Sequence, residues 1–393
     1  MINNVKDIEI AKNEVCEYID SISEELISVS HSIHENPELC YEEHFAHDLL
    51  TGVLIEKGLD VEKNAYGIET AFKSETGNTG PVVAVLCEYD ALPGIGHGCG
   101  HNIIAASGLG AGLATSSLAE RLGGQIRILG TPAEEGGGGK VKMLREGAFD
   151  KVSATLMVHP ADCDLTGISS LAVQQLKASY TGKASHAAAA PEKGVNALDG
   201  AVLGYMAVAA LRQHISQDQR LHGIFTDGGQ KANIVPEYAE ATWYARAATS
   251  EDLQVLKKRL VAALEGAAKS AGCSMNIEWV GEPYSEVVDN EPLLGAYVKN
   301  SERLGRSVAL PDLNKVVGST DLGNVSQMMP SIHPMIKAAP TGTAIHTKTF
   351  ANSAISKEGD KAVLDAAKIL AMTVIDCWCS EQLLKKADAF FNR

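Results

Sequence analysis

The sequence predicts an α/β fold, in which a mostly parallel sheet is flanked by helices and a smaller α+β domain is inserted. Strand-like apolar runs alternate with helical segments over residues 81–159, an order typical of parallel sheets. Residues 172–280 follow a different order of strands and helices. The chain has 393 residues, more than the ~250 to 300 at which a single hydrophobic core stops growing, so two domains are expected.

The first domain opens with helices and continues with alternating strands. Helical periodicity over residues 14–60 is interrupted at Asn36-Pro37-Glu38, where the proline ends one helix before another over 42–57. Apolar runs of strand length and the helical segments between them follow at 81–88, 102–122, 125–130, 140–146 and 155–159. After Tyr284 the chain resumes a helix, a strand and a helix. We therefore place this domain at residues 1–170 and 286–393.

The middle of the chain has the element order of a ferredoxin-like unit. Strands are predicted at residues 172–181, 224–235, 239–246 and 274–280. Helices are predicted at 195–214, after the first strand, and at 252–271, before the last strand. A β-α-β-β-α-β order forms a compact domain of its own. We therefore predict an inserted domain over residues 171–285.

Composition and charge argue against several classes of function. Apolar residues make up 45% of the chain and aromatic residues 5%, which is ordinary for a soluble α/β protein. The net charge of −15 argues against nucleic acid or an anionic membrane surface as partner, because phosphate binding needs a basic patch. No apolar run approaches the ~20 residues of a membrane span, and no apolar signal core is seen. With eight scattered cysteines, we expect a cytoplasmic protein with reduced thiols.

A glycine-rich turn at residues 96–102, GHGCGHN, indicates a metal site. Cys99 and His101 stand two residues apart in it, which suits two ligands that close on one ion. A lone buried cysteine is more often inert packing, and His97 is an alternative ligand, so further ligands must come from elsewhere. Acidic or imidazole side chains follow apolar runs, where an α/β sheet carries its functional groups, at Glu134, Glu135, His159 and His346.

The pair Glu134-Glu135 offers two carboxylates with different roles. Neighbouring residues in extended backbone point to opposite sides, so one can bind a metal while the other faces the attacking water as general base. In isolation the same pair is more commonly a solvated acidic loop. The glycines at 136–139 and Lys140 do not form a phosphate loop, because Val141 stands where that motif needs Ser or Thr.

The candidate ligands outnumber those of a structural zinc site. One thiol, three imidazoles and one carboxylate make five, whereas a structural zinc ion uses four. A set of this size suits a two-metal hydrolytic centre, whose ions lie ~3.5 to 4 Å apart. Asp90, which closes the strand at 82–88, is expected to orient a ligand through a hydrogen bond. Its alternative role is to cap the turn before Leu92-Pro93.

Several segments along nearly the whole chain resemble the M20 metallopeptidase and amidohydrolase family. They are ALPGIGHGCGHN, GTPAEEGGGGK, MVHP, GKASHAAAAPEKGVNALDG, GGQKANIVPE, GSTDLGNVSQMMPSIHP and AIHTKTF. Within the family the chain is similar to the branch that holds amidohydrolases of p-aminobenzoyl-glutamate and indole-acetyl amino acids, and most of all to dipeptidases of the Xaa-Arg or β-alanyl-lysine type. The last similarity rests on GHGCGHN and PSIHP.

The resemblance implies a zinc-peptidase-like catalytic domain with two divalent metals per chain. The family's general base falls on Glu134, and its metal positions fall on Cys99, His101, Glu135, His159 and His346. Glu88 stands where most of the wider family has a histidine ligand, and Cys99 where an aspartate bridges the metals. Thiolate with imidazole favours zinc, and manganese and cobalt are the alternatives that relatives of this branch suggest.

The resemblance also implies roles outside the metal centre. His186 in the inserted domain corresponds to a donor that stabilises the oxyanion, often supplied across a homodimer by this domain. Asn233 and Arg246 resemble substrate-binding positions, with Arg246 as a clamp for a carboxylate. Ser319 and Thr320 resemble part of a substrate-pocket loop. From the residues alone, a helix-capping histidine, a turn asparagine and a surface arginine are the alternative interpretations.

Together these features predict a metal-dependent hydrolase that cleaves the amide bond of a small dipeptide or N-acyl amino acid. Glu134 is the predicted general base, Asp90 orients a metal ligand, and His186 stabilises the oxyanion. A homodimer through the inserted domain is expected. An amidohydrolase of p-aminobenzoyl-glutamate or indole-acetyl amino acids is the alternative. A noncatalytic metal-dependent binding protein on the same fold is a remote one. A structural-zinc protein would cluster its ligands, whereas these spread from residue 99 to residue 346.

Overall fold

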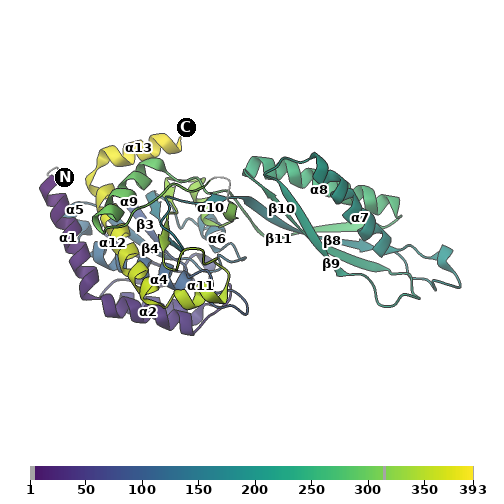
Figure 1. The fold of residues 1–393 in the computed structure, drawn as a ribbon, viewed down its shortest axis with the longest axis horizontal. Helices are drawn as coiled ribbons and strands as arrows, with labels where there is room; N and C mark the ends of the chain where they lie inside the picture. The colour runs from purple at the N-terminus through teal and green to yellow at the C-terminus, as the bar shows by residue number, and fades with distance from the viewer. Residues whose placement is uncertain (1–4, 313–315, 393) are drawn as a thin grey trace. The chain divides into compact units, whose positions relative to one another are not determined.

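A computed structural model describes residues 5–312 and 316–392 and divides the chain into two compact units (Figure 1). Unit 1 combines Met1–Ser169 with Val287–Arg393, and unit 2 is Ser170–Glu286. Across the described ranges, every helix falls short of the length and continuous apolar character that a bilayer crossing demands.

A six-stranded sheet forms the centre of unit 1. In spatial order its strands are β1 (Val61–Lys63), β2 (Phe72–Thr76), β4 (Gln125–Gly130), β3 (Val82–Cys87), β5 (Val152–Leu156) and β13 (Ser331–Ile332). The strands from β4 to β13 pair in parallel, whereas β2 is antiparallel to both of its neighbours. The expected mostly parallel sheet is confirmed. Strands β1 and β2, which are short and partly polar, were not predicted.

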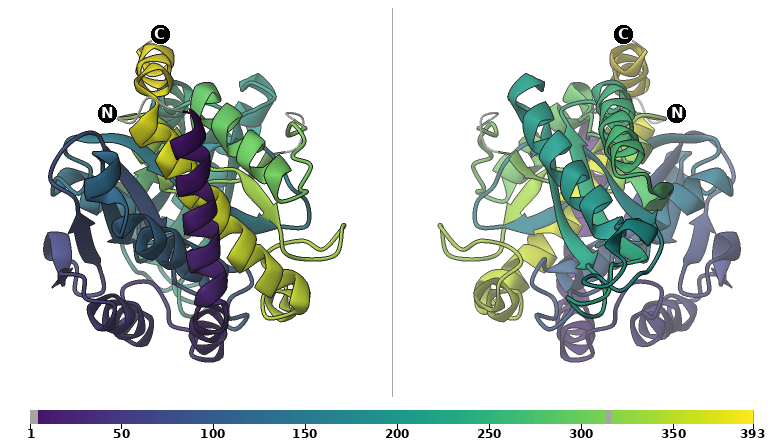
Figure 2. Two further views of the ribbon diagram at one scale, coloured as in Figure 1. Left: turned by 90° about the vertical axis from the view of Figure 1, so that its left-hand side faces the viewer. Right: turned by 90° about the vertical axis from the view of Figure 1, so that its right-hand side faces the viewer.

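Helices cover both faces of this sheet. In chain order, unit 1 has α1 (Val5–Ser21), α2 (Ser23–Glu35), α3 (His44–Glu56), η1 (Ala65–Gly67), α4 (His101–Ser116), α5 (Ala119–Leu122), α6 (Gly139–Arg145), α9 (Glu291–Arg303), α10 (Leu322–Ser326), α11 (Lys348–Ser353), α12 (Lys357–Cys379) and α13 (Glu381–Phe391). Helix α12 packs against α4 and α1, and Figure 2 shows α1 crossing in front of α12. The helix expected over 102–122 is two helices, α4 and α5, with a turn between them.

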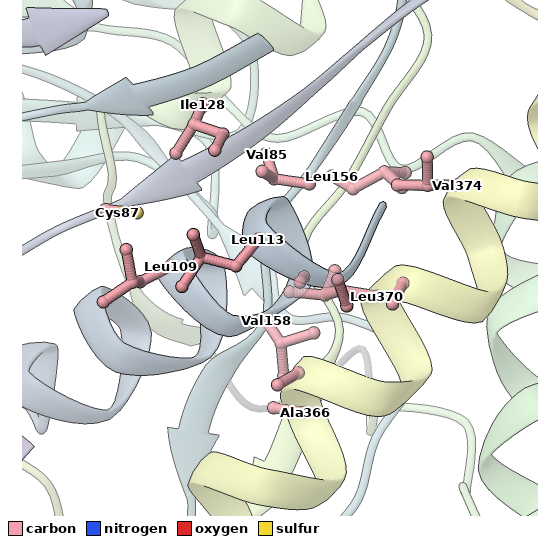
Figure 3. Close-up of a cluster of buried hydrophobic side chains, with 14 of the residues drawn as sticks. Val85, Cys87, Leu109, Leu113, Ile128, Leu156, Val158, Ala366, Leu370 and Val374 are labelled. Carbon is pink, nitrogen blue, oxygen red and sulfur yellow. The ribbon is translucent and has the colours of Figure 1, made fainter. Parts of the chain in front are cut away.

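Alternate residues of the central strand β3 enter two different cores. Val83 and Val85 pack into the core under α4 and α12, whereas Ala84 and Leu86 pack into a second core with α6 and α10. Figure 3 shows the first core, where side chains of α4 and α12 meet Val85 beside Ile128 and Leu156 of the neighbouring strands. Because β3 is buried on both faces, its sequence is a continuous apolar run. The core thereby fixes α4, whose first residue is His101.

Two short strand pairs lie outside the main sheets. Strand β6 (His159–Ala161) pairs in parallel with β14 (Met335–Lys337), and β7 (Ser169–Ser170) pairs with β12 (Val316–Gly318). The single strand expected over 155–159 is therefore wrong, because β5 ends at Leu156 and β6 begins at His159. The backbone N–H of His159 donates to the carbonyl oxygen of Pro334 at 3.0 Å, so the chain changes partner strand at this point.

Unit 2 has the predicted order β-α-β-β-α-β. Its main elements are β8 (Ala172–Thr181), α7 (Ala197–Leu211), β9 (Arg220–Asp227), β10 (Tyr238–Ala247), α8 (Ser250–Ser270) and β11 (Ser274–Tyr284), with short turns η2 (Pro191–Lys193) and η3 (Arg212–His214). The sheet order is β11-β8-β10-β9, and every pair is antiparallel. Buried and less buried residues alternate along β8 and β10, and Trp243 and Tyr180 fill the core beneath α7 and α8.

One strand of unit 2 lies elsewhere than predicted. The apolar pattern predicts this strand at 224–235, whereas β9 spans Arg220–Asp227. The strand ends before Gly228 and Gly229, and Gly229 has a φ of +95°, which lies in the left-handed region that extended strands do not use. Residues 228–237 form an irregular segment that contains Asn233.

The close packing of α4 on β3 can be tested at Gly108. A Cβ at this position would lie 2.3 Å from the backbone oxygen of Leu86, which belongs to the central strand and cannot move away. We expect Gly108→Ala to lower the free energy of unfolding by ~1–3 kcal/mol. The matched control is Gly52→Ala on α3, where a Cβ meets no atom within 4 Å, and it should be neutral or stabilising by up to about 1 kcal/mol. Denaturant unfolding of both variants checks this, and equal midpoints would contradict the packing.

Candidate metal centre

Functional side chains of unit 1 follow the carboxyl ends of its parallel strands. Glu88 and Asp90 come directly after β3, and Glu134 and Glu135 lie in the loop after β4. His159 follows β5 by three residues and opens β6. Carboxyl ends of parallel strands meet at one edge of a sheet, so these side chains converge from separate parts of the sequence.

The glycine-rich turn brings Cys99 and His101 to the same edge. Gly100 has a φ of +77° and directly precedes α4, and a Cβ there would lie 2.6 Å from the ring of Pro160 in β6. Glycine is therefore needed both for the left-handed backbone and for the close approach of β6. Through this approach Cys99 comes near His159.

His346 reaches the site from a loop. The expectation that it directly follows an apolar strand is wrong, because β14 ends at Lys337. His346 has a φ of +62°, and its backbone N–H donates to the carbonyl oxygen of Gly98 at 2.8 Å. This hydrogen bond fastens the loop to the turn that carries Cys99.

The predicted ligands come together in three overlapping groups that could hold metal ions. In each group the candidate ligand atoms lie within 4.8 Å of one another, and the groups are Cys99 with His101 and His159, Cys99 with Glu135 and His346, and His101 with Glu134 and Glu135. The Cys99 sulfur lies 3.5 Å from the Nε2 atoms of both His159 and His346. Cys99 is thus common to two groups.

The ring of His101 has one bonded nitrogen and one buried nitrogen without a partner. Nδ1 lies 3.1 Å from Asp90 Oδ1. Nε2 faces three carboxylates, and it lies 3.6 Å from Glu88 Oε2, 3.9 Å from Glu134 Oε2 and 4.0 Å from Glu135 Oε1. Within the described residues, His101 Nε2 and Glu135 Oε1 are buried and have no hydrogen-bond partner. Buried polar atoms rarely stay unpaired, and a cation between them would satisfy both. Thiol, imidazole and carboxylate are donors that divalent transition metals take, so the residues fit a metal.

The candidate ligand His159 is held in its neutral form. Its Nδ1 lies 2.8 Å from the carbonyl oxygen of Pro160, an acceptor only, so Nδ1 carries the proton and Nε2 presents its lone pair toward Cys99. Burial, followed by the nearby rings of His333 and His101, lowers the pKa of His159 well below its usual value. The uncharged form is the one that binds metals.

Asp90 connects two of the candidate ligands. Burial would raise the pKa of this carboxyl, but the hydrogen bond and charge of His101 outweigh it and lower the pKa to about 2. The other carboxylate oxygen accepts the backbone N–H of Glu135 at 2.9 Å. Asp90 therefore fixes both the ring of His101 and the backbone from which Glu135 projects.

The two neighbouring glutamates face the same way. The extended backbone expected at Glu134-Glu135 is wrong, because Ala133 has a φ of +61° and residues 134–137 form a turn. Both carboxylates consequently lie near His101 Nε2. Burial, together with the charges of Glu88 and Glu135, raises the pKa of Glu134 well above its usual value. A carboxylate with a raised pKa accepts a proton readily near neutral pH.

Sequence reasoning missed a fully buried ion network beside this group. Lys140 Nζ lies 2.5 Å from Glu88 Oε1 and 2.7 Å from Asp321 Oδ1, and all three side chains are inaccessible to solvent. Burial would lower the pKa of Lys140, but the charges of Asp321 and Glu88 outweigh it and raise the pKa. The three residues come from α6, the end of β3 and the start of α10, so no sequence pattern links them.

Two buried histidines stay outside the candidate groups of the described residues. The alternative ligand His97 has its Nε2 3.1 Å from the carbonyl oxygen of Ile33, a contact that occupies this atom. His333, which was not predicted, lies beside His159 with ring centroids 5.3 Å apart and ring planes tilted by 31°. It lies in the PSIHP segment, where the motif itself was the available signal.

In unit 2, His186 and Asn233 lie side by side. His186 is exposed, and its Nδ1 accepts the backbone N–H groups of Ala188 and Ala189 at 3.2 and 3.1 Å. The proton therefore sits on Nε2, which faces outward as a donor. The carbonyl oxygen of Asn233 accepts the N–H of Ala187 at 3.1 Å, which joins the two segments.

Arg246 lies at the opposite end of the sheet of unit 2. It pairs with Val173 at the start of β8, whereas Tyr238, at the end near His186, pairs with Thr181. Eight residues of strand separate Tyr238 from Arg246, about 27 Å at ~3.4 Å per residue. Unit 2 therefore does not bring His186 and Arg246 together. The Arg246 guanidinium lies 5.7 Å from the ring centre of Tyr244.

Ser319 and Thr320 lie in the loop between β12 and α10 of unit 1. Ser319 is half-buried and Thr320 is buried. The Thr320 hydroxyl oxygen accepts the backbone N–H of Leu322 at 3.2 Å, and the next residue is Asp321 of the ion network. This loop is therefore held against α6 through Lys140.

Comparison with known proteins identifies the family of the chain. Residues 84–375 match the model of peptidase family M20/M25/M40, so the chain belongs to this family, as the motifs predict. It is 39% identical over 404 residues to a Xaa-Arg dipeptidase from Mus musculus, with 98% of this chain and 92% of that protein covered. The chain is a hydrolase of the M20 metallopeptidase and amidohydrolase family.

Two further comparisons agree with this family. The chain is 28% identical over 452 residues to one of the subunits of p-aminobenzoyl-glutamate hydrolase from Escherichia coli (strain K12), with 95% of this chain and 94% of that protein covered. A crystal structure from Bacillus subtilis, described as a dinuclear metal binding peptidase from the M20 family, matches with a TM-score of 0.70. It is 21% identical and covers 91% of this chain and 98% of its own, and it supports the fold.

The position of Cys99 in two groups leads to a spectroscopic prediction. With cobalt as probe, the wild type should show thiolate-to-cobalt charge-transfer absorption, and Cys99→Ser should lose it because no other cysteine joins a candidate group of the described residues. We also expect its metal affinity to fall by more than the ~10- to 100-fold that follows loss of a partner outside the coordination sphere. The control is Cys40→Ser, whose thiol lies 3.5 Å from Asp90 Oδ2 but in no group. An unchanged Cys99→Ser spectrum would exclude this thiol as ligand.

Proposed function

We propose that the chain is a metal-dependent dipeptidase or N-acyl amino acid hydrolase that cleaves one amide bond of a small substrate. The observation that carries this proposal is the Cys99 sulfur, which belongs to two candidate metal groups, with the Glu134 carboxylate in an adjoining group. Adjoining groups of this kind suit two divalent ions that act on one substrate. Membership of the M20 family supports the proposal.

Five side chains hold the metals in this proposal, namely Cys99, His101, Glu135, His159 and His346. The combination of thiolate and imidazole favours zinc, with manganese and cobalt as alternatives. Bound ions would supply Lewis acidity, which polarises the scissile carbonyl and lowers the pKa of a water molecule.

Glu134 acts as the general base. Its carboxylate lies in the group with His101 and Glu135, and its raised pKa allows it to hold the proton taken from the attacking water. Glu134 then passes this proton to the leaving amine, which cannot depart as an anion. Asp90 keeps the ring of His101 oriented throughout, because its hydrogen bond to Nδ1 leaves Nε2 directed at the two glutamates.

His186 donates a hydrogen bond to the oxyanion from its outward Nε2–H, and Asn233 binds substrate beside it. Arg246 binds the substrate carboxylate with its planar fork. Because ~27 Å of strand separates Arg246 from Tyr238, which lies at the end of the sheet near His186, one small substrate cannot touch both His186 and Arg246 in one chain. The pair therefore suits a substrate that contacts one of them from each of two chains.

We propose a homodimer through the inserted domain to supply that second chain. Strand β9 is an edge of its sheet, so one row of its backbone groups has no neighbouring strand in unit 2. Ile224 and Phe225 on this strand are 66% and 43% exposed, and Met206 of α7 is 62% exposed. Exposed apolar side chains beside an open strand edge are typical of an interface.

The substrate is a small amide, and a dipeptide with a C-terminal arginine is the first choice. The Xaa-Arg dipeptidase of the mouse, 39% identical over nearly the whole chain, supports this choice. A p-aminobenzoyl-glutamate or indole-acetyl amino acid substrate is the alternative. Ser319 and Thr320 line the substrate pocket in this proposal. A cytoplasmic location fits the eight free cysteines, and the net charge of −15 does not favour nucleic acid.

The division of labour between the two glutamates can be measured. The metal-loaded protein, assayed on a panel of dipeptides and N-acyl amino acids, should hydrolyse Xaa-Arg dipeptides fastest. Glu134→Gln should lower turnover by ~10²- to 10⁴-fold with its metal content kept, because the amide cannot take up the proton. Glu135→Gln should lose both turnover and bound metal. Elemental analysis of the two variants measures their metal content. The reverse pattern of metal loss would contradict the assignment, and no amide hydrolysis with any metal would contradict the function.

The role of His186 is tested by mixing two inactive variants. His186→Ala should lower turnover by ~10²- to 10³-fold, the loss that follows removal of one oxyanion donor, with metal content unchanged. If His186 acts on the site of the partner chain, exchange of chains between His186→Ala and Glu134→Gln dimers creates one site with both wild-type residues. Activity should then recover. Proven exchange without recovery would exclude donation between chains.

A further inference from the structure

A buried glutamate outside the metal groups contacts the turn that carries Glu134 and Glu135. Glu43, which directly precedes α3, is inaccessible to solvent. Its Oε1 accepts the backbone N–H groups of Tyr41 and Ala133, each at 2.9 Å, and its Oε2 accepts the hydroxyl of Thr70 at 2.8 Å. Neither the motifs nor the proposed mechanism assign Glu43 a role.

The hydrogen bond from Ala133 to Glu43 is made at a residue whose backbone conformation is unfavourable. Ala133 has a φ of +61°, a left-handed conformation that costs an L-residue free energy and persists only when its surroundings hold it. Its carbonyl oxygen accepts the N–H groups of Gly137 and Gly139 at 3.1 and 3.4 Å, and its own N–H is held by Glu43. The next residue is Glu134, so this peptide sets the direction in which the two glutamates leave the loop.

A second contact from the same segment holds the far end of the turn. The Tyr41 hydroxyl donates to the carbonyl oxygen of Gly137 at 2.6 Å. A Cβ at Gly137 would lie 2.6 Å from both the Ala133 Cβ and the Tyr41 ring, so the turn lies directly against this ring. Residues 41–43 therefore hold residues 133–137 at both ends through these two hydrogen bonds.

We propose that Glu43 is a positioning residue, whose hydrogen bond to Ala133 aims Glu134 and Glu135 at His101. The inference rests on the proposed function of Glu134 as general base. Misplacement of a catalytic group by ~1 Å can lower a rate by ~10²-fold, so a bond one residue before the base has a large effect on turnover. Without it, Ala133 can relax toward negative φ and swing both carboxylates away from His101 Nε2.

The length of the side chain, and not its charge, is what this role requires. Burial, with a contribution from the charge of Asp90, raises the pKa of Glu43 to about 7, so an uncharged side chain is tolerated at this position. Glutamine keeps the oxygen that accepts from Ala133, and its amide can donate to the Thr70 hydroxyl. Aspartate keeps the charge but is one methylene too short to reach both Ala133 and Thr70.

The test compares Glu43→Gln and Glu43→Asp in the full-length, metal-loaded protein. We expect Glu43→Gln to keep both kcat and metal affinity close to the wild type. Glu43→Asp should lower kcat by ~10²-fold at saturating metal with little change in KM, and it should bind metal more weakly because Glu135 moves together with Glu134. The control is Glu38→Ala, because the Glu38 carboxylate accepts the N–H groups of Phe45 and Ala46 at the same helix start without touching the turn. This variant should lower the melting temperature and leave kcat unchanged.

Each outcome separates this inference from the proposed function. If Glu134→Gln is inactive while Glu43→Asp has wild-type kcat, the positioning role is wrong and the proposed function stands. If Glu134→Gln stays active, the proposed function fails first. A loss in Glu43→Asp that only follows its folded fraction, or a larger loss in Glu43→Gln than in Glu43→Asp, also overturns the inference. If Glu43→Asp does not fold, Tyr41→Phe is tested instead, because it removes the hydrogen bond from the Tyr41 hydroxyl to Gly137. This variant should lower kcat by up to about tenfold. A wild-type kcat in Tyr41→Phe would overturn the inference.

Discussion

The geometry of the candidate metal centre depends on the Asp90 carboxylate. It lies almost fully buried beyond the end of β3, and it holds the ring of His101 and the backbone N–H of Glu135. These two contacts connect the first residue of α4 to the loop after β4, which the sheet alone would leave free to move. Because His101 in turn lowers the pKa of Asp90, the carboxyl stays ionised in a place where burial by itself would protonate it.

Several carboxylates of unit 1 lie close together in a small buried volume. Nearby cationic or nitrogen groups offset the repulsion between them in two ways. Glu88 and Asp321 share the ammonium group of Lys140. Glu134 and Glu135 face Nε2 of His101, to which Glu88 Oε2 also comes within 3.6 Å, and both belong to a candidate metal group. Isolated charges in a protein interior cost several kcal/mol each, on the order of the whole stability of a domain, so this pairing is a condition for folding.

The sequence was most informative where side chains repeat with a regular period. Strands β4 and β8 begin and end at the predicted residues, because a buried run and an alternating run leave clear patterns. It was least informative where backbone conformation depends on a distant partner. The strand expected over 155–159 divides because His159 bonds to Pro334, and β9 stops early because Gly229 adopts a left-handed conformation.

By itself, the sequence determined the α/β class, the inserted unit, the family, and the chemical types of the candidate ligands near the ends of apolar runs. Only the tertiary structure decided how they meet: His346 is tied to Gly98, Lys140 lies between Glu88 and Asp321, and Glu43 holds Ala133. The physical reason is that periodicity and turn propensity act over a few residues. The direction of a loop side chain depends instead on hydrogen bonds and ion pairs between segments that only folding brings together, which is why both glutamates after β4 turn toward one histidine.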